Sequence, residues 1–191
     1  MSNLEHLVQT LKKTTLTGIN RKIGNYDEII STLVEYFIEI KNNKNTIYFI
    51  GNGGSAAISM HMTVDFLKNG NIRTHDMHAP AVLTCLGNDF GYDQIFSKQI
   101  EMIAEPYDLL VAISSSGESS NILNAVKVAH EKKCKIITFS GFKESNSLSL
   151  LGDLNVYVPN MNYGTVESIH NIILQDVVDE IKKIDDFGER I

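Results

Sequence analysis

The chain is poor in the residues that mark several classes of protein. Its 191 residues include only two cysteines, Cys85 and Cys134, and both lie in apolar runs. We therefore expect two reduced cysteines in the core and no disulfide framework, as in a cytosolic protein. No apolar run reaches 18 residues, and the first ten residues lack the basic start and apolar stretch of a signal peptide. These absences predict a cytoplasmic protein with no membrane span.

Positive charge is also scarce. The chain has 17 Lys and Arg against 23 Asp and Glu, a net charge of −6, and no basic run is longer than two residues, as in Lys132-Lys133. Nucleic-acid-binding proteins usually carry a basic face, so we expect no nucleic-acid partner. A small anionic ligand is still compatible with this composition, because backbone dipoles bind anions without basic side chains.

The first part of the chain, residues 1–43, is predicted to be a helical arm. Apolar residues recur at spacings of three and four and form one stripe, at Ile29, Leu33, Phe37 and Ile40. The pair Gly24-Asn25 is predicted to divide the arm into two helices. The apolar stripe is consistent with packing either on another subunit or on the chain's own core.

After the arm, short apolar runs alternate with helical patterns. The apolar runs are residues 46–50, 108–114, 135–140 and 154–159, with a weaker one at 73–77, and the helical patterns are residues 54–68, 92–104, 119–132 and 165–183. Continuous β-branched and aromatic runs are typical of strands buried on both faces. Residues 44–191 are therefore predicted to form a single α/β domain, a parallel sheet flanked by helices in a flavodoxin-like three-layer arrangement. In such sheets ligands bind at the carboxyl ends of the strands.

A glycine-rich loop, Gly51-Asn52-Gly53-Gly54-Ser55, follows the first of these strands. Glycines allow close approach of the backbone to a ligand, and the helix that follows offers free N–H groups. The loop is neither a Walker loop nor a dinucleotide-binding loop, so we expect no nucleotide cofactor. Taken alone, a tight turn with Ser55 near the helix cap explains it equally well.

A serine-rich loop, Ser114-Ser115-Ser116-Gly117-Glu118-Ser119-Ser120-Asn121, follows a second strand. Five serines exceed what helix capping needs, and hydroxyls together with helix N–H groups can surround a phosphate. Two such loops in one sheet favour a phosphorylated small molecule as the ligand.

The segments "GNGGSAA", "SSSGESSN" and "GNDFGYDQIFSKQIE" resemble the sugar-isomerase (SIS) domain. More closely, they resemble bacterial phosphoheptose isomerases, which convert sedoheptulose 7-phosphate to D-glycero-D-manno-heptose 7-phosphate for surface polysaccharides. The resemblance implies phosphate contacts at Ser55, Ser114, Ser115, Ser116 and Ser119. It also implies substrate contacts at Asn52, Gly53, Gly54, Asn88, Asp89 and Glu167. From the residues alone, Asn88-Asp89 before Gly91 is also compatible with a simple turn.

On the helix predicted over 54–68, the buried stripe is expected to be Ala56, Met60, Val64 and Leu67. His61 and Asp65 are four residues apart and share a face beside this stripe. The pair is open to two interpretations, a structural pair in which Asp65 orients His61 and a pair that takes part in chemistry.

The resemblance also implies an acid/base and zinc-binding set of histidine and glutamate on this helix and glutamine and histidine on the last helix. His61 matches that set, whereas Asp65, Glu167 and Gln175 stand at the other three positions. Asp65 is one methylene shorter than glutamate, and Gln175 cannot transfer protons near neutral pH. Three hypotheses follow.

In the first hypothesis Asp65 and Glu167 share the proton transfer, assisted by His61 or His170. In the second, one divalent ion such as zinc is bound by His61, Asp65 and Glu167, with Gln175 at the fourth family position. In the third, isomerase activity is lost, and the chain is a non-catalytic sugar-phosphate-binding protein that acts through protein partners. Because all four positions remain polar, the sequence favours an isomerase.

Helix geometry bears on the assembly. Glu167 and Gln175 are eight residues apart, about 12 Å along one helix. If both contact one ligand, they come more easily from different subunits. We therefore expect a homotetramer with sites at subunit interfaces, as the family resemblance also implies.

Overall fold

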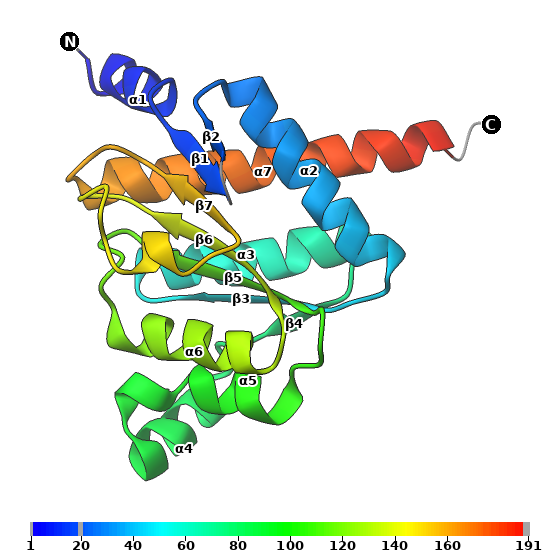
Figure 1. Ribbon diagram of the computed structural model, residues 1–191, viewed down its shortest axis with the longest axis vertical. Coiled ribbons are helices and arrows are strands. Elements are labelled where there is room, and N and C mark those ends of the chain that lie inside the picture. The colour runs from blue at the N-terminus through cyan, green and yellow to red at the C-terminus, as the bar shows by residue number, and fades with distance from the viewer. Residues whose placement is uncertain (1, 19–20, 189–191) are drawn as a thin grey trace.

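The computed structural model describes residues 2–18 and 21–188 (Figure 1). The first elements in chain order are α1 (Asn3–Leu11), β1 (Thr15–Gly18), β2 (Arg21–Ile23), α2 (Tyr26–Asn42), β3 (Ile47–Gly51), α3 (Gly54–Lys68), β4 (Thr74–Asp76) and α4 (Pro80–Phe90). They are followed by η1 (Tyr92–Gln94), α5 (Ser97–Ile103), β5 (Leu109–Ser114), α6 (Ser120–Glu131), β6 (Lys135–Ser140), η2 (Leu148–Leu150), β7 (Leu154–Tyr157) and α7 (Tyr163–Gly188).

Over the described ranges, seven strands form one sheet in the order β2-β1-β7-β6-β5-β3-β4. Strands β3 to β7 are parallel to one another, whereas β1 is antiparallel to both β7 and β2. The predicted parallel α/β sheet is thus confirmed for five adjacent strands, β7-β6-β5-β3-β4. The prediction was wrong in leaving out an antiparallel hairpin that extends the β7 edge.

Helices cover both faces of the sheet, which confirms the three-layer arrangement. In Figure 1, α2, α3 and α7 lie on one side of the sheet and α4, α5 and α6 on the other. Alternate residues of each central strand point to opposite faces. Phe49 and Val111 therefore enter the core under α2, α3 and α7, whereas Ile50 and Ala112 enter the core under α5 and α6.

The N-terminal arm is only partly helical. Residues 15–18 and 21–23, predicted as helix, form the antiparallel hairpin instead. Threonines flank Leu16, and β-branched residues favour strands. Leu16 is buried and pairs with Val156 of β7, a partner that no local pattern could indicate. Gly24-Asn25 was predicted to separate two helices, but it separates β2 from α2, and Asn25 caps α2 by accepting from the Glu28 backbone N–H at 3.0 Å.

The apolar stripe of α2 packs on the chain's own core. Its four residues, Ile29, Leu33, Phe37 and Ile40, are each at most 1% exposed. Of the two interpretations of this stripe, packing within the same chain is therefore confirmed.

Two other helical predictions need correction. Helix α4 was not predicted, and the helix expected from residue 92 begins only at Ser97, after the short turn η1. Gly91 ends α4 with a φ of +93°, a conformation that directs the chain into a new element.

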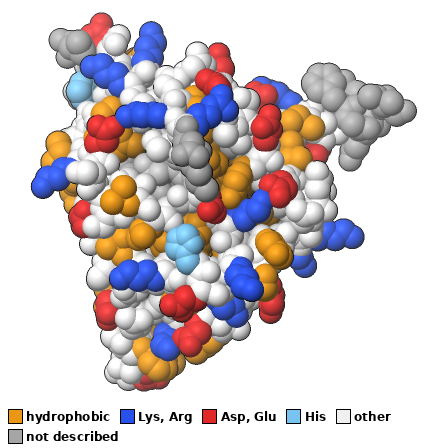
Figure 2. Space-filling view, viewed as in Figure 1, with side chains coloured by type: hydrophobic (Ala, Val, Ile, Leu, Met, Phe, Trp, Pro, Cys, Tyr) orange, Lys and Arg blue, Asp and Glu red, His pale blue; other side chains and the backbone are white. Residues whose placement is uncertain are grey.

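The surface carries both signs of charge. Figure 2 shows acidic and basic side chains interspersed over one face of the molecule. None of the helices within the described ranges is long and apolar enough to cross a membrane. Both cysteines are free, and Cys134 is buried as expected, but Cys85 is exposed. The core prediction for Cys85 was wrong because it lies on the outer face of α4, where its Sγ is 3.6 Å from Asp89 Oδ2.

Candidate functional site

The two predicted anion loops meet where the direction of chain connection reverses. Strands β3 and β5 are neighbours, with Gly51 opposite Ile113. From this pair the chain continues to β4 on one side and to β6 on the other. The loops after β3 and β5 therefore emerge side by side at the carboxyl ends of the strands, the usual ligand position in such sheets.

A cavity of about 240 Å³ lies between these loops. It is lined by Asn52, Gly53, Gly54, Ser55, Ile113, Ser114, Ser115, Ser116, Ser119, Tyr163 and Glu167. We call it the serine pocket. All five predicted phosphate contacts lie in its lining, together with Asn52, Gly53, Gly54 and Glu167. Their role in binding stays a prediction.

The donors of the serine pocket are neutral. Its lining in the described chain contains hydroxyls and backbone N–H groups, and no Lys, Arg or His. Helices α3 and α6 both begin at the pocket, and neither Gly53 nor Ser119 at their N-caps forms a side-chain cap hydrogen bond. The Ser55 and Ile122 backbone N–H groups bond to the Asn52 and Ser119 carbonyl oxygens, whereas the N–H groups of Gly54 and Ser120 have no partner among the described residues. These N–H groups are available to an anion, and the helix dipoles favour negative charge there.

One hydroxyl of the pocket has no internal partner. Ser115 is 4% exposed, and its Oγ forms no hydrogen bond with the described residues. A buried unpaired hydroxyl costs about 1–3 kcal/mol. A bound oxyanion that accepts from Ser115 would remove this cost.

The serine loop is held in shape by its own contacts. The Gly117 backbone N–H lies 3.0 Å from the Ser114 carbonyl oxygen and 3.2 Å from Ser114 Oγ. Gly117 has a φ of +68°, and a Cβ at this position would lie 2.0 Å from Asn146 Oδ1. Only glycine fits this turn without displacing Asn146, a buried residue that itself donates to Ser140 Oγ.

A reciprocal amide pair joins the two loops. Asn52 and Asn121 each donate from Nδ2 to the other's Oδ1 at 2.9 Å. The hydroxyl of Tyr92 donates to Asn52 Oδ1 at 3.1 Å. Although the resemblance implies that Asn52 contacts substrate, its side chain is engaged in joining the loops and η1.

Glu167 is the one carboxylate in the pocket lining. A Cβ added to Gly54 would lie 2.3 Å from Glu167 Oε2, so the carboxylate packs directly on the start of α3. Burial raises the pKa of Glu167 above its usual value. A carboxylate with a raised pKa beside a phosphate pocket is suited to general acid/base chemistry.

Asn88 and Asp89 lie outside the lining of the serine pocket. Both are exposed in the last turn of α4, and Asn88 Nδ2 donates to Asp89 Oδ1 at 2.9 Å. The interpretation of these two residues as a simple turn was wrong, because the helix continues to Phe90. Tyr163, by contrast, lines the pocket and was missed. Tyr163 lies one helical turn before Glu167, which could have indicated that both side chains face the same pocket. The predicted helix began at residue 165, however, and so did not include Tyr163.

His61 and Asp65 form a pair on α3, with Nε2 and Oδ2 3.2 Å apart. Asp65 follows Gly54 by eleven residues, about 16 Å along the helix, and does not line the serine pocket. The pair therefore lies away from the pocket of its own chain.

The buried face of α3 was misassigned. Met60, Val64 and Leu67 are 44%, 56% and 54% exposed. The buried face consists instead of Ser55, Ile58, Ser59, Met62, Thr63 and Phe66. Phe66 decides the orientation, because its ring packs 4.6 Å from Phe37 and 5.3 Å from Phe49 between ring centroids.

The four candidate metal-binding side chains are not brought together in one chain. Gln175 donates to Asp179 Oδ1 at 3.1 Å, one turn further along α7. Across residues 2–18 and 21–188, no group of three or more His, Cys, Asp or Glu side chains could hold a metal ion. The residues of one chain do not fit a zinc site, and no reaction step is assigned to a metal.

His170 is a core residue. It is fully buried, its Nε2 lies 3.1 Å from the Ser140 carbonyl oxygen, and its ring meets Phe139 edge-on. Burial lowers the pKa of His170 to about 4. It is therefore neutral at neutral pH, and its surroundings do not suit the assisting role that the sequence suggested.

Acid is expected to destabilise the protein through His170. The ordinary pKa is 6.5 and the folded value about 4, so the unfolded chain takes up this proton first as the pH falls. About 3 kcal/mol of stability should be lost between pH 6.5 and pH 4. Urea unfolding at several pH values measures the free energy of unfolding, which should depend less steeply on pH in His170→Gln than in the wild type. The exposed-residue control His75→Gln should keep the wild-type slope, and equal slopes in all three proteins would contradict this account.

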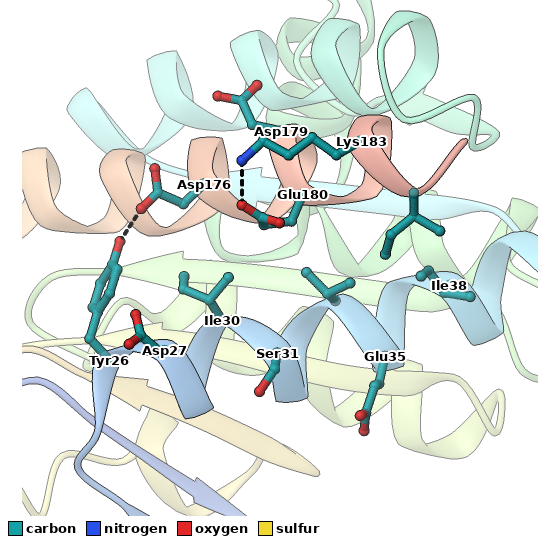
Figure 3. Close-up of a pocket in the computed structure, with 12 residues that line it drawn as sticks. Tyr26, Asp27, Ile30, Ser31, Glu35, Ile38, Asp176, Asp179, Glu180 and Lys183 are labelled. Carbon is teal, nitrogen blue, oxygen red and sulfur yellow. Dashed lines mark hydrogen bonds and ion pairs between the residues drawn. The ribbon is translucent and has the colours of Figure 1, made fainter. Parts of the chain in front are cut away.

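A larger cavity of about 730 Å³ lies between α2 and α7 (Figure 3). Tyr26 donates to Asp176 Oδ2 at 2.5 Å, and burial together with this carboxylate raises the pKa of Tyr26. Five carboxylates and one lysine line this cavity, at Asp27, Glu35, Asp176, Asp179, Glu180 and Lys183. Its excess of negative charge disfavours a phosphate, so the smaller serine pocket is the better candidate site.

Comparisons with known proteins agree with the fold. A family model described as SIS domain matches residues 15–141. The phosphoheptose isomerase of Aliarcobacter butzleri is 34% identical over 160 residues, which cover 80% of this chain and 83% of the relative. The phosphoheptose isomerase of Buchnera aphidicola subsp. Schizaphis graminum is 36% identical over 152 residues, which cover 74% of this chain and 78% of the relative.

The solved structures that resemble this chain include two phosphoheptose isomerases. Phosphoheptose isomerase GmhA from Neisseria gonorrhoeae superposes with a TM-score of 0.76 at 29% identity, covering 82% of this chain and 86% of the other. A phosphoheptose isomerase from Francisella tularensis superposes with a TM-score of 0.75 at 27% identity, and it also covers 82% of this chain and 86% of the other. The chain belongs to the SIS domain family and, within it, to the phosphoheptose isomerases.

Proposed function

We propose that the protein is an aldose–ketose isomerase that converts sedoheptulose 7-phosphate to D-glycero-D-manno-heptose 7-phosphate. The observation that carries the proposal is the serine pocket, which combines neutral donors, the unpaired Ser115 hydroxyl and the Glu167 carboxylate in one cavity. Membership of the phosphoheptose isomerases supports this substrate. The neutral donors bind the phosphate, and the carboxylate faces the sugar chain that extends from it.

The reaction moves hydrogen between two neighbouring carbons. A base removes a proton from C1 of the ketose while the C2 carbonyl oxygen gains a proton, which gives an enediol. Return of a proton to C2 and loss of the O1 proton then give the aldose. We assign these transfers to Glu167 and Asp65, because both are carboxylates that can alternate between base and acid. Gln175 cannot take part, since an amide does not exchange protons near neutral pH.

The proposed assembly is a homotetramer in which a second subunit completes each site. The separation between the His61–Asp65 pair and the serine pocket of the same chain supports this arrangement. Met60, Val64 and Leu67 expose apolar surface on the same helix, which suits contact with a neighbouring copy. We further propose a cytoplasmic enzyme that supplies heptose for surface polysaccharide, in line with the family resemblance.

A second candidate function is a sugar-phosphate-binding protein without catalysis. Gln175 favours it, because the position that the family uses for proton transfer holds an amide bonded to Asp179. Sedoheptulose 7-phosphate turnover followed by NMR separates the two functions. Conversion to the aldose supports the isomerase, whereas binding without conversion supports the alternative. Parallel reactions with EDTA and with zinc test whether assembled subunits supply a metal site.

Ser115→Ala is expected to weaken phosphate binding. Loss of one hydrogen bond to a charged group costs about 1.5–3 kcal/mol, so KM should rise about 10- to 100-fold with little change in kcat. Steady-state kinetics on the purified variant give both constants. Ser120→Ala is the matched control, because Ser120 belongs to the same loop but is exposed and does not line the pocket. An unchanged KM for Ser115→Ala would remove this hydroxyl from the phosphate site.

A further inference from the structure

A buried histidine lies behind the glycine loop, outside the serine pocket. His78 is 7% exposed and follows β4 by two residues. Its Nε2 lies 3.2 Å from the carbonyl oxygen of Gly51, the last residue of β3. A carbonyl oxygen only accepts hydrogen bonds, so Nε2 carries the proton and donates.

The sheet register explains why a side chain is needed here. Strands β3 and β4 pair in parallel from Ile47–Thr74 to Phe49–Asp76, and β4 then ends. Ile47 donates to the Arg73 carbonyl on this side, and alternate residues of a strand face the same neighbour. The backbone of Gly51 therefore faces the place where β4 no longer continues. The imidazole of His78 supplies the missing partner.

The surroundings of His78 fix its orientation. Asp76 Oδ1 accepts from the His78 backbone N–H at 2.9 Å and lies 3.5 Å from Nδ1. The ring packs against Phe96 at 5.3 Å between centroids. Gln99 donates to the Met77 carbonyl at 3.1 Å and anchors the adjoining backbone. The ring is thus held on several sides with Nε2 aimed at Gly51.

Gly51 in turn contacts the start of α3. A Cβ at Gly51 would lie 2.5 Å from the backbone carbon and oxygen of Ser55. The Gly51 peptide is therefore confined between His78 and the first turn of the helix whose N-terminus opens into the serine pocket. A shift of this peptide would move Gly53, Gly54 and Ser55 together.

We infer that His78 is a positioning residue for the serine pocket, which fixes the Gly51 peptide and the first turn of α3 through its hydrogen bond to the Gly51 carbonyl. The inference rests on the proposed function in taking this pocket as the phosphate site. His78 itself does not line the pocket, so it acts through the backbone. It also ties the glycine loop to the segment that leads into α4.

Three substitutions separate hydrogen bonding from packing. His78→Leu removes the donor, His78→Asn places an amide too short to reach Gly51, and His78→Gln places an amide N–H near the position of Nε2. We expect the Kd for inorganic phosphate, measured by calorimetry, to rise about tenfold in the Leu and Asn variants. In the Gln variant it should stay within about threefold of the wild type. In turnover, KM should rise more than kcat falls.

The matched control is His75→Leu, three residues earlier on β4 and exposed, with its ring beside Tyr48 rather than Gly51. Hydrogen–deuterium exchange of peptides covering residues 49–58 provides a readout that needs no ligand. Exchange there should be faster in the Leu and Asn variants and restored in the Gln variant. If the Leu variant does not fold, the comparison of Asn with Gln still decides the matter.

Equal phosphate affinity and equal loop exchange in wild type, His78→Asn and His78→Gln would overturn the inference. So would a Gln variant no better than the Asn variant. Failure of the proposed function looks different, because wild-type protein would then bind neither inorganic phosphate nor sedoheptulose 7-phosphate. In that case the exchange pattern of the glycine loop still tests the role of His78.

Discussion

Replacing Asp65 with asparagine is expected to lower kcat for sedoheptulose 7-phosphate by about 10²–10⁴-fold. Asparagine keeps the size and can still pair with His61, but it removes the acid/base group assigned to the reaction. Because Asp65 does not line the serine pocket and is assigned to the reacting carbons of the sugar, phosphate binding should not change. Steady-state kinetics and phosphate calorimetry on the same preparation measure both effects. A kcat within twofold of the wild type would show that Asp65 takes no part in proton transfer.

Mixed oligomers test whether Asp65 acts on the pocket of a neighbouring subunit. Asp65→Asn has an intact pocket, whereas Ser115→Asp keeps Asp65 and places a carboxylate where the phosphate should bind. Each variant alone should be inactive. After co-expression, about a quarter of the sites combine an intact pocket with an intact Asp65, and activity should recover accordingly. If mass spectrometry confirms mixed oligomers and activity stays absent, the shared site is wrong.

Replacing Phe66 with alanine is expected to cost about 3–5 kcal/mol of unfolding free energy. Phe66 is fully buried, and its ring contacts Phe37 of α2 and Phe49 of β3. The substitution would leave a cavity where two helices and the sheet meet, and none of these elements can close it alone. Guanidinium unfolding followed by circular dichroism measures the loss.

Leu150→Ala is the control for Phe66→Ala, because Leu150 is 78% exposed and its truncation should change stability by less than about 0.5 kcal/mol. A loss for Phe66→Ala no larger than that of this control would mean that the observed buried face of α3 is incorrect. The result also bears on the sequence interpretation, which placed the buried stripe on the opposite side of this helix.

Local patterns predicted the central sheet because its strands are buried on both faces. Runs such as residues 46–50 and 108–114 are apolar throughout, so no choice of face was needed. Helix α3 required such a choice, and its sequence carries apolar residues on both sides, with Met60 and Val64 on one and Met62 and Phe66 on the other. Only contact with Phe37 and Phe49 selects between them, and that contact depends on the tertiary fold.

The candidate site also contains features that local sequence predicts and features that depend on the tertiary fold. The two loops were predictable because each follows a strand directly and carries its donors in consecutive residues. His78 reaches the glycine loop only through strand order and register, which a local pattern does not contain, and the same holds for the pairing of Asn121 with Asn52. The sequence also could not show that Glu167 packs on Gly54 while Asp65 lies about 16 Å along α3.

The antiparallel hairpin has a consequence for the order in which the protein can be completed during synthesis. Strand β1 leaves the ribosome early, but its neighbour β7 ends at Tyr157, paired with Thr15. At about 5–20 residues per second, this partner emerges on the order of ten seconds later. Until then β1 has β2 as its only described strand neighbour. Among the strands of this sheet, β1 and β2 are thus made before the others but complete their pairing among the last.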